Sequence, residues 1–163
     1  AVPGSKSSNS LVFTCQVVLS EVLSTYMVLI HYSVEPSYST MADFGFALFS
    51  LSGEQVVSEH VTVGPFSVKI LDMARIIPAS VLERERDPQD GQSAFTITGY
   101  SKGAALIPLV INAAPELGSV SVEHTHPPQT YLFPPQANLR RKIKADAENK
   151  WDTILAKGMS SQS

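Results

Sequence analysis

The sequence has little cysteine and little charge. A single cysteine, Cys15, occurs among 163 residues, so no disulfide can form within the chain. This slightly favours a cytoplasmic location and leaves a secreted or periplasmic one open. Because Cys15 lies inside the apolar run 11–19, we expect a buried structural thiol rather than a nucleophile.

Charged residues make up 17% of the chain, and the net charge is −3. This balance predicts neither nucleic acid nor an anionic membrane as a partner. The sequence also lacks a phosphate-binding loop, a dinucleotide fingerprint, an EF-hand, a zinc-finger spacing and an RNA-binding aromatic motif. Known motifs therefore leave the function open.

No uninterrupted hydrophobic run is long enough to cross a membrane. Residues 11–30 come nearest, but polar residues including Glu21 interrupt them, and a carboxylate at mid-membrane costs about 3 kcal/mol. A signal peptide is not expected either, because no small-residue cleavage site follows. We interpret this region as two strands joined by a turn.

The chain is instead rich in short apolar or alternating segments separated by turn residues, which indicate strands. The expected strands are 11–19, 26–34, 43–51, 55–63, 66–70, 93–98, 104–111 and 119–126, with turns at Ser52-Gly53, Gly64-Pro65, Asp90-Gly91 and Glu116–Gly118. Residues 73–77 can form one helical turn, and the mixed-charge stretch 82–92 is expected to be a solvated loop. This pattern predicts an antiparallel β-sandwich or jelly-roll-like barrel of about eight strands, with one C-terminal α-helix.

Alternation also predicts which side chains share a face of each strand. Phe66, Val68 and Ile70 share one face and are expected to point inward. Val120 and Val122 share another face with the two histidines that follow, so these histidines are expected at the mouth of the apolar core. In the strand 43–51, one face carries the small residues Gly45 and Ala47, which suggest close packing or a bulge.

We expect one folded domain with two extensions. Residues 1–10 form a polar lead, 11–135 the β-sandwich with a Pro-rich arm at 127–135, 136–158 a helix packed on the domain or on a partner, and 159–163 a tail. The helix carries an apolar stripe at Leu139, Ile143, Ala147, Trp151, Ile154 and Leu155. Its six basic and three acidic residues give 6 − 3 = +3, which leaves −3 − 3 = −6 for the rest of the chain.

The segment His124-Thr-His126 is the first candidate site. Two histidines two residues apart on a strand project in parallel and can share a divalent transition metal with a third ligand, for which His60 is a candidate. Cupin metal sites begin with such a pair but add a nearby glutamate and a later histidine. Here Gln129 follows, and no histidine occurs after His126. The sequence therefore predicts no cofactor, with a metal as the alternative.

A second candidate is Gly99-Tyr-Ser-Lys-Gly103, which matches the G-x-S-x-G pattern of a nucleophile elbow. A serine hydrolase of that type needs strand–helix units on both sides of the serine, whereas this chain has hairpin signals there. A glycine-flanked turn between two strands explains the same residues without catalysis.

The third candidate is a contact surface for a partner. Tyr131 and Phe133 in the Pro-rich arm can anchor it on a partner or on the protein's own sandwich, and Arg140 and Arg141 can meet an acidic surface. Several strands also carry apolar residues on both faces. The leading hypothesis is thus a non-enzymatic module that binds a protein partner or forms a homo-oligomer.

Overall fold

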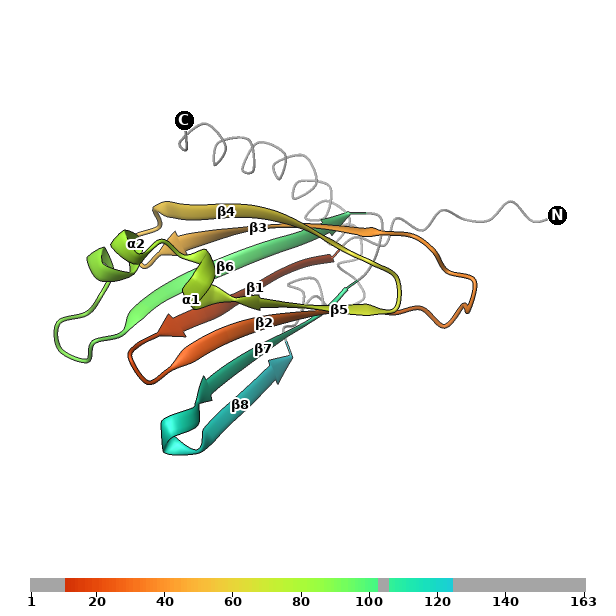
Figure 1. Ribbon diagram of the computed structural model, residues 1–163. Helices are drawn as coiled ribbons and strands as arrows, with labels where there is room; N and C mark the ends of the chain where they lie inside the picture. The colour runs from red at the N-terminus through yellow and green to blue at the C-terminus, as the bar shows by residue number, and fades with distance from the viewer. Residues whose placement is uncertain (1–10, 103–105, 125–163) are drawn as a thin grey trace, which may run out of the picture.

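The computed structural model describes residues 11–102 and 106–124. In this part of the chain, eight strands form two antiparallel four-stranded sheets that pack on each other as a β-sandwich (Figure 1). The predicted β-sandwich is therefore confirmed. The expected C-terminal helix, the Pro-rich arm and the polar lead lie outside the described residues.

Each sheet mixes strands from distant parts of the sequence. Sheet A has the order β1 (Leu11–Leu19), β6 (Ser93–Lys102), β3 (Ala42–Ser50) and β4 (Gln55–Val63). Sheet B has the order β5 (Ser67–Asp72), β2 (Ser24–His31), β7 (Ile107–Ala114) and β8 (Ser119–His124). Two short helices, α1 (Met73–Ile76) and α2 (Ala79–Arg84), follow β5, and a 3-10 helix, η1 (Pro115–Leu117), joins β7 to β8.

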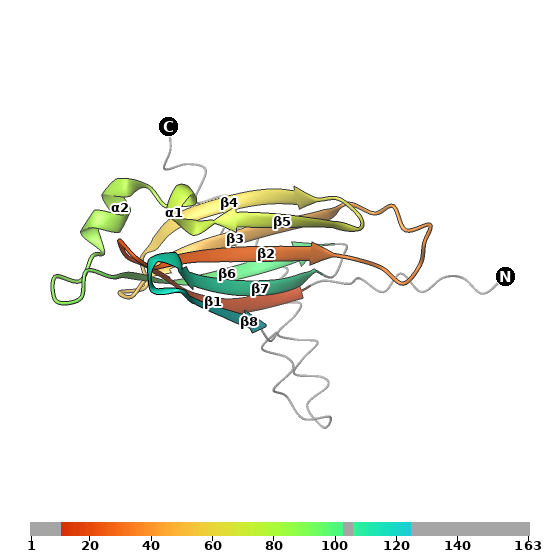
Figure 2. The same ribbon diagram turned by 60° about the horizontal axis from the view of Figure 1, so that its bottom comes forward.

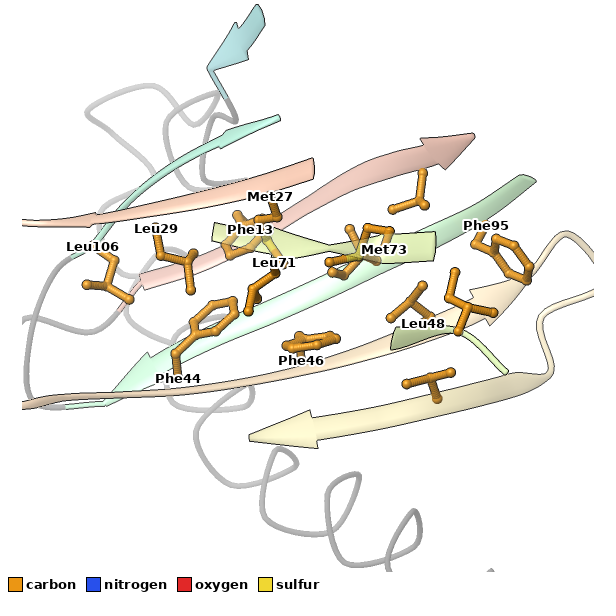
Figure 3. Packing of buried hydrophobic residues seen from close by; sticks show 14 of the residues in the cluster. Phe13, Met27, Leu29, Phe44, Phe46, Leu48, Leu71, Met73, Phe95 and Leu106 are labelled. Carbon is orange, nitrogen blue, oxygen red and sulfur yellow. The ribbon is translucent and has the colours of Figure 1, made fainter. Parts of the chain in front are cut away.

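The core lies between the two sheets and is rich in phenylalanine (Figure 3). The rings of Phe13 and Phe44 stack with centroids 5.6 Å apart, and Phe46 stacks on Phe44 at 5.9 Å. Met27 and Leu29 of β2 are buried against them from sheet B. Both sheets thus contribute one apolar face to a shared interior, as expected for a sandwich.

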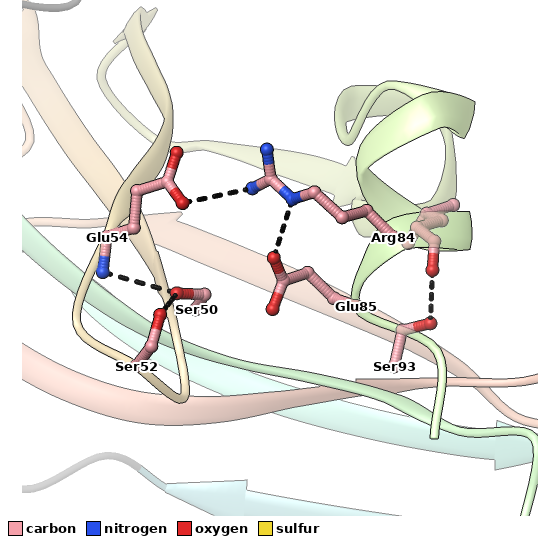
Figure 4. A network of polar contacts seen from close by, with 7 residues as sticks. Ser50, Ser52, Glu54, Arg84, Glu85 and Ser93 are labelled. Carbon is pink, nitrogen blue, oxygen red and sulfur yellow. Dashed lines mark hydrogen bonds and ion pairs between the residues drawn. The ribbon is translucent and has the colours of Figure 1, made fainter. Parts of the chain in front are cut away.

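The stretch 82–92 is not entirely a loop, because α2 continues to Arg84. Val81 and Leu82 pack against the core, and the hydroxyl of Ser93 donates to the carbonyl oxygen of Leu82 at 2.8 Å. Arg84 also pairs with Glu85 and reaches Glu54 in the β3–β4 hairpin at 3.4 Å (Figure 4). Packing and these contacts stabilise a helix that charge content alone did not predict.

In the two edge strands β5 and β8, the apolar side chains point away from the core, whereas the prediction placed them toward it. Val68 and Ile70 of β5 are 57% and 62% exposed, and Phe66 beside them is 52% exposed. In β8, Val120 and Val122 are 66% and 60% exposed. Alternation shows only which side chains share a face. The pairing register places these residues beside the outward side chains of β2 and β7.

Candidate functional site

His60 contacts a carboxylate on the outer face of sheet A. Its Nε2 lies 2.8 Å from the Oδ1 atom of Asp43 on the neighbouring strand β3, and both side chains are about half exposed. An exposed pair of this kind is worth little to stability. His60 therefore has a local partner that explains its position.

The structure does not bring the strand position of His124 to His60. His124 ends β8, where its backbone pairs with Leu109 in sheet B, whereas His60 is in sheet A. His126, Tyr131, Phe133, Arg140 and Arg141 lie outside the described residues. Among residues that are described, no group of three or more His, Cys, Asp or Glu can hold a metal ion. The metal site at His124 and His126 stays a prediction, which elemental analysis of the purified protein can decide.

His31 is a fully buried histidine with partners at both ring nitrogens. Its Nδ1 lies 3.1 Å and 3.0 Å from the carbonyl oxygens of Val63 and Gly64, and its Nε2 lies 3.2 Å from the Tyr38 hydroxyl. Carbonyl oxygens only accept, so Nδ1 donates. The ring therefore ties the end of β2 to the β4–β5 turn and to the loop carrying Tyr38, which is a structural role.

Ser101 does not lie in a nucleophile elbow. It is an interior residue of β6, and its backbone positions pair with Leu11 on one side and Phe44 on the other. It is also 0% exposed. A nucleophile elbow instead presents its serine at a sharp turn beyond the end of a strand. The geometry of Gly99–Lys102 thus gives a hydrolase no support.

Cys15 is a poor nucleophile. Burial, and to a lesser degree the negative charge of Glu123, raises the pKa of its thiol from 9.0 to about 12. A thiol with that pKa is almost entirely protonated at neutral pH, and the thiolate is the reactive form. The expected structural role of Cys15 is supported.

The feature that stands out is the outer surface of sheet B, which we call the apolar face. All four strands contribute to it, and they lie side by side in both views (Figures 1 and 2). It consists of Tyr26, Val28, Ile30, Val68, Ile70, Ile107, Leu109, Ile111, Ala113, Val120 and Val122. The pairing register adds two polar positions at the border, Asp72 opposite Tyr26 and His124 opposite Leu109. A surface with so few charged positions is unusual for the solvent side of a sheet.

Cross-strand rows make this surface continuous. Ile70, Val28 and Leu109 form one row across β5, β2 and β7, and Tyr26, Ile111 and Val122 form the next across β2, β7 and β8. The central Val28 is 8% exposed, whereas Ile70 and Val122 on the edge strands are 62% and 60% exposed. The edges of the apolar face are therefore its most accessible part.

The sequence contained a signal for this surface. The strands β2 and β7 are apolar at successive positions, such as Met27-Val28-Leu29-Ile30, so both of their faces need cover. Alternation did not show that the apolar residues of β5 and β8 extend the outer face of sheet B. The pairing register supplies that information.

Comparison with known proteins adds no function. No protein-family model matches the chain. A search of curated proteins also finds no match. Among solved structures, the crystal structure of Thermotoga maritima 1070 aligns with a TM-score of 0.49 at 8% identity, over 73% of this chain and 93% of that one. That likeness is too weak to carry an argument. No helix among the described residues is long and apolar enough to span a membrane.

Proposed function

We propose that this protein is a non-enzymatic β-sandwich module that assembles with itself, and that the apolar face is the contact surface between two copies. The continuous apolar surface spanning all four strands of sheet B carries this proposal. Exposed apolar surfaces that are contiguous over several strands commonly mark interaction sites.

The scarcity of charge on the apolar face favours a second copy of this chain as its partner. Its one charged position by register, Asp72 beside Tyr26 at the end of β5, is already paired with Arg75, so the apolar face offers little that selects an acidic or basic partner. Two copies related by a two-fold axis would bring identical apolar surfaces together, sheet against sheet. This repeats the packing already seen between sheets A and B, and self-association interfaces are typically more apolar than transient ones.

The exposed edge residues of the apolar face supply the driving force. Val68, Ile70, Val120 and Val122 are each more than half exposed. Covering each of them would contribute about 1 kcal/mol, taking roughly half the value for complete burial of an aliphatic side chain. Contacts of the partly buried central residues add to this. Association at micromolar concentration is the expected consequence.

Light scattering coupled to gel filtration tests the proposal. Ile70→Arg introduces a charge into the apolar face and is expected to convert the wild-type assembly to monomer. Leu51→Arg is the matched control, because Leu51 is also an exposed aliphatic residue, at 75%, but lies in the β3–β4 turn of sheet A. Equal molar masses for wild type and both variants would refute the apolar face as the interface.

A further inference from the structure

Strand β8 forms one border of sheet B. Among the described strands it pairs only with β7, through six consecutive residue pairs (Figures 1 and 2). Its side chains from position 119 to 123 are exposed on both faces, with Ser119 and Ser121 on one and Val120 and Val122 on the other. The outer row of its backbone N–H and C=O groups pairs with no described strand, and such a row is a template for another strand.

The other three edges of the sandwich each carry a feature that hinders such pairing. Lys69 lies in the middle of β5, and the extra residue Val56 makes a bulge in β4. On β1, the hydroxyl oxygen of Thr25 accepts a hydrogen bond from the backbone N–H of Val18 at 3.1 Å. Lysines, bulges and covered backbone groups keep edge strands from pairing. Strand β8 has no lysine, no proline and no register shift in its pairing with β7.

We infer that β8 is a second contact between copies of this chain, in which two β8 strands pair antiparallel across a two-fold axis. An axis perpendicular to the sheet places side chains of the same face opposite one another. When it passes through Ser121, Val120 lies opposite Val122 of the second copy, and Glu123 lies opposite Ser119 of the second copy. Valines then meet valines, and the two glutamates stay apart.

Continuity with the apolar face favours a second copy as the partner of this edge. Val120 and Val122 belong to that face, so joining two β8 edges merges the apolar faces of two copies into one surface. Glu123 is the only acidic residue of β8, and the two-fold register brings no like charges together. This contact goes beyond the proposed one, because it uses the backbone edge of sheet B and lets the assembly grow past two copies.

The edge contact is expected to be weaker than the contact through the apolar face. A six-residue strand edge is much smaller than the roughly 1,200 Å² of a stable interface, so pairing is expected near ~1 mM. Ile70→Arg isolates this contact, because it disrupts the apolar face and leaves β8 unchanged. Light scattering of that variant should give the mass of one chain at micromolar concentration and approach that of two chains near millimolar concentration.

Ser121→Lys, added to the Ile70→Arg protein, tests whether β8 is the contact. It places two lysines opposite each other at the centre of the pair, and the dissociation constant should rise several-fold. Gln16→Lys is the matched control, because it makes the same charge change at an exposed position of β1 and should leave association unchanged. An Ile70→Arg protein that stays a single chain up to millimolar concentration, or that is insensitive to Ser121→Lys, would overturn the inference.

Cross-linking tests the register of the two strands. In a Cys15→Ala background near millimolar concentration, Ser121→Cys should form a disulfide between two copies when oxidised glutathione is supplied, because opposite Cα atoms lie about 4.5–5.5 Å apart. Ser119→Cys is the matched control, since its two copies would lie four residues apart along the strands, or about 13 Å. Equal cross-linking of both variants would overturn the two-fold pairing.

The two contacts between copies can fail separately. A wild type that is dimeric at micromolar concentration, with an Ile70→Arg variant that stays a single chain at millimolar concentration, would refute the edge contact alone. A wild type that is a single chain at micromolar concentration, and that doubles its mass near millimolar concentration unless Ser121→Lys is present, would refute the apolar face alone.

Discussion

Phe13 lies so close to Gly99 that a β-carbon on this glycine would come within 2.5 Å of the phenyl ring. The same β-carbon would lie 2.7 Å from Phe44, which stacks on Phe13. Gly99 is therefore the point at which β6 makes room for the central aromatic stack. Its place in a G-x-S-x-G pattern is accounted for by packing.

Gly99→Ala is expected to lower the free energy of unfolding by about 1–3 kcal/mol, because the added methyl group overpacks the core. Gly64→Ala is the matched control, since its β-carbon would meet nothing closer than 3.4 Å and its φ is not in the left-handed region. Urea denaturation measures both. Equal stability of Gly99→Ala and wild type would contradict the packing role.

His31→Leu should destabilise the fold by about 1–3 kcal/mol, because it leaves the Val63 and Gly64 carbonyl oxygens without their buried donor. Tyr38→Phe removes one hydroxyl contact and should cost less, about 1 kcal/mol. Denaturation of both variants checks this order. If Tyr38→Phe were the more damaging of the two, the importance assigned to the Nδ1 contacts would be wrong.

Phe66 has a φ of 54°, a left-handed conformation that is unfavourable for a bulky side chain. Phe66→Gly and Phe66→Ala both remove the ring and its contact with Tyr38, but only glycine also removes the strain. The glycine variant should therefore be more stable than the alanine variant by about 1 kcal/mol. Thermal denaturation compares them, and alanine equal to glycine would show that the turn relaxes at no cost.

The pKa of Cys15 predicts a dependence of stability on pH. The folded protein keeps the thiol protonated up to a pKa of about 12, whereas the unfolded chain ionises near 9.0. Above pH 9 the unfolded state binds fewer protons, so the contribution of Cys15 to stability is lost as pH rises toward 12. Cys15→Ala should show a shallower decline than wild type over this range in denaturant titrations. Parallel curves would contradict the shifted pKa.

The sequence predicted the strands well because their signals are local. Leu11–Leu19 and Gln55–Val63 match the expected bounds, and the hairpin turn at Gly53 has the positive φ that favours glycine. It also singled out Gly45 and Ala47 as a closely packed face, and both are buried. Strand order was beyond its reach, because pairings such as β1 with β6 depend on contacts between distant segments.

The side on which an edge strand buries its apolar residues was also not predictable from local pattern. Val120 and Val122 alternate as core residues would, yet β8 pairs with β7 so that they continue the outer face. Of the candidate site, the sequence correctly indicated strands with two apolar faces. It did not indicate that one of these surfaces is continuous across sheet B.

The molar mass of the unmodified protein in solution tests the self-assembly most directly. Light scattering at micromolar concentration is expected to give a multiple of the 17.6 kDa chain mass, twice that value for two copies joined through the apolar face. The mass should fall toward that of a single chain on dilution. A mass of one chain throughout the micromolar range would contradict self-assembly.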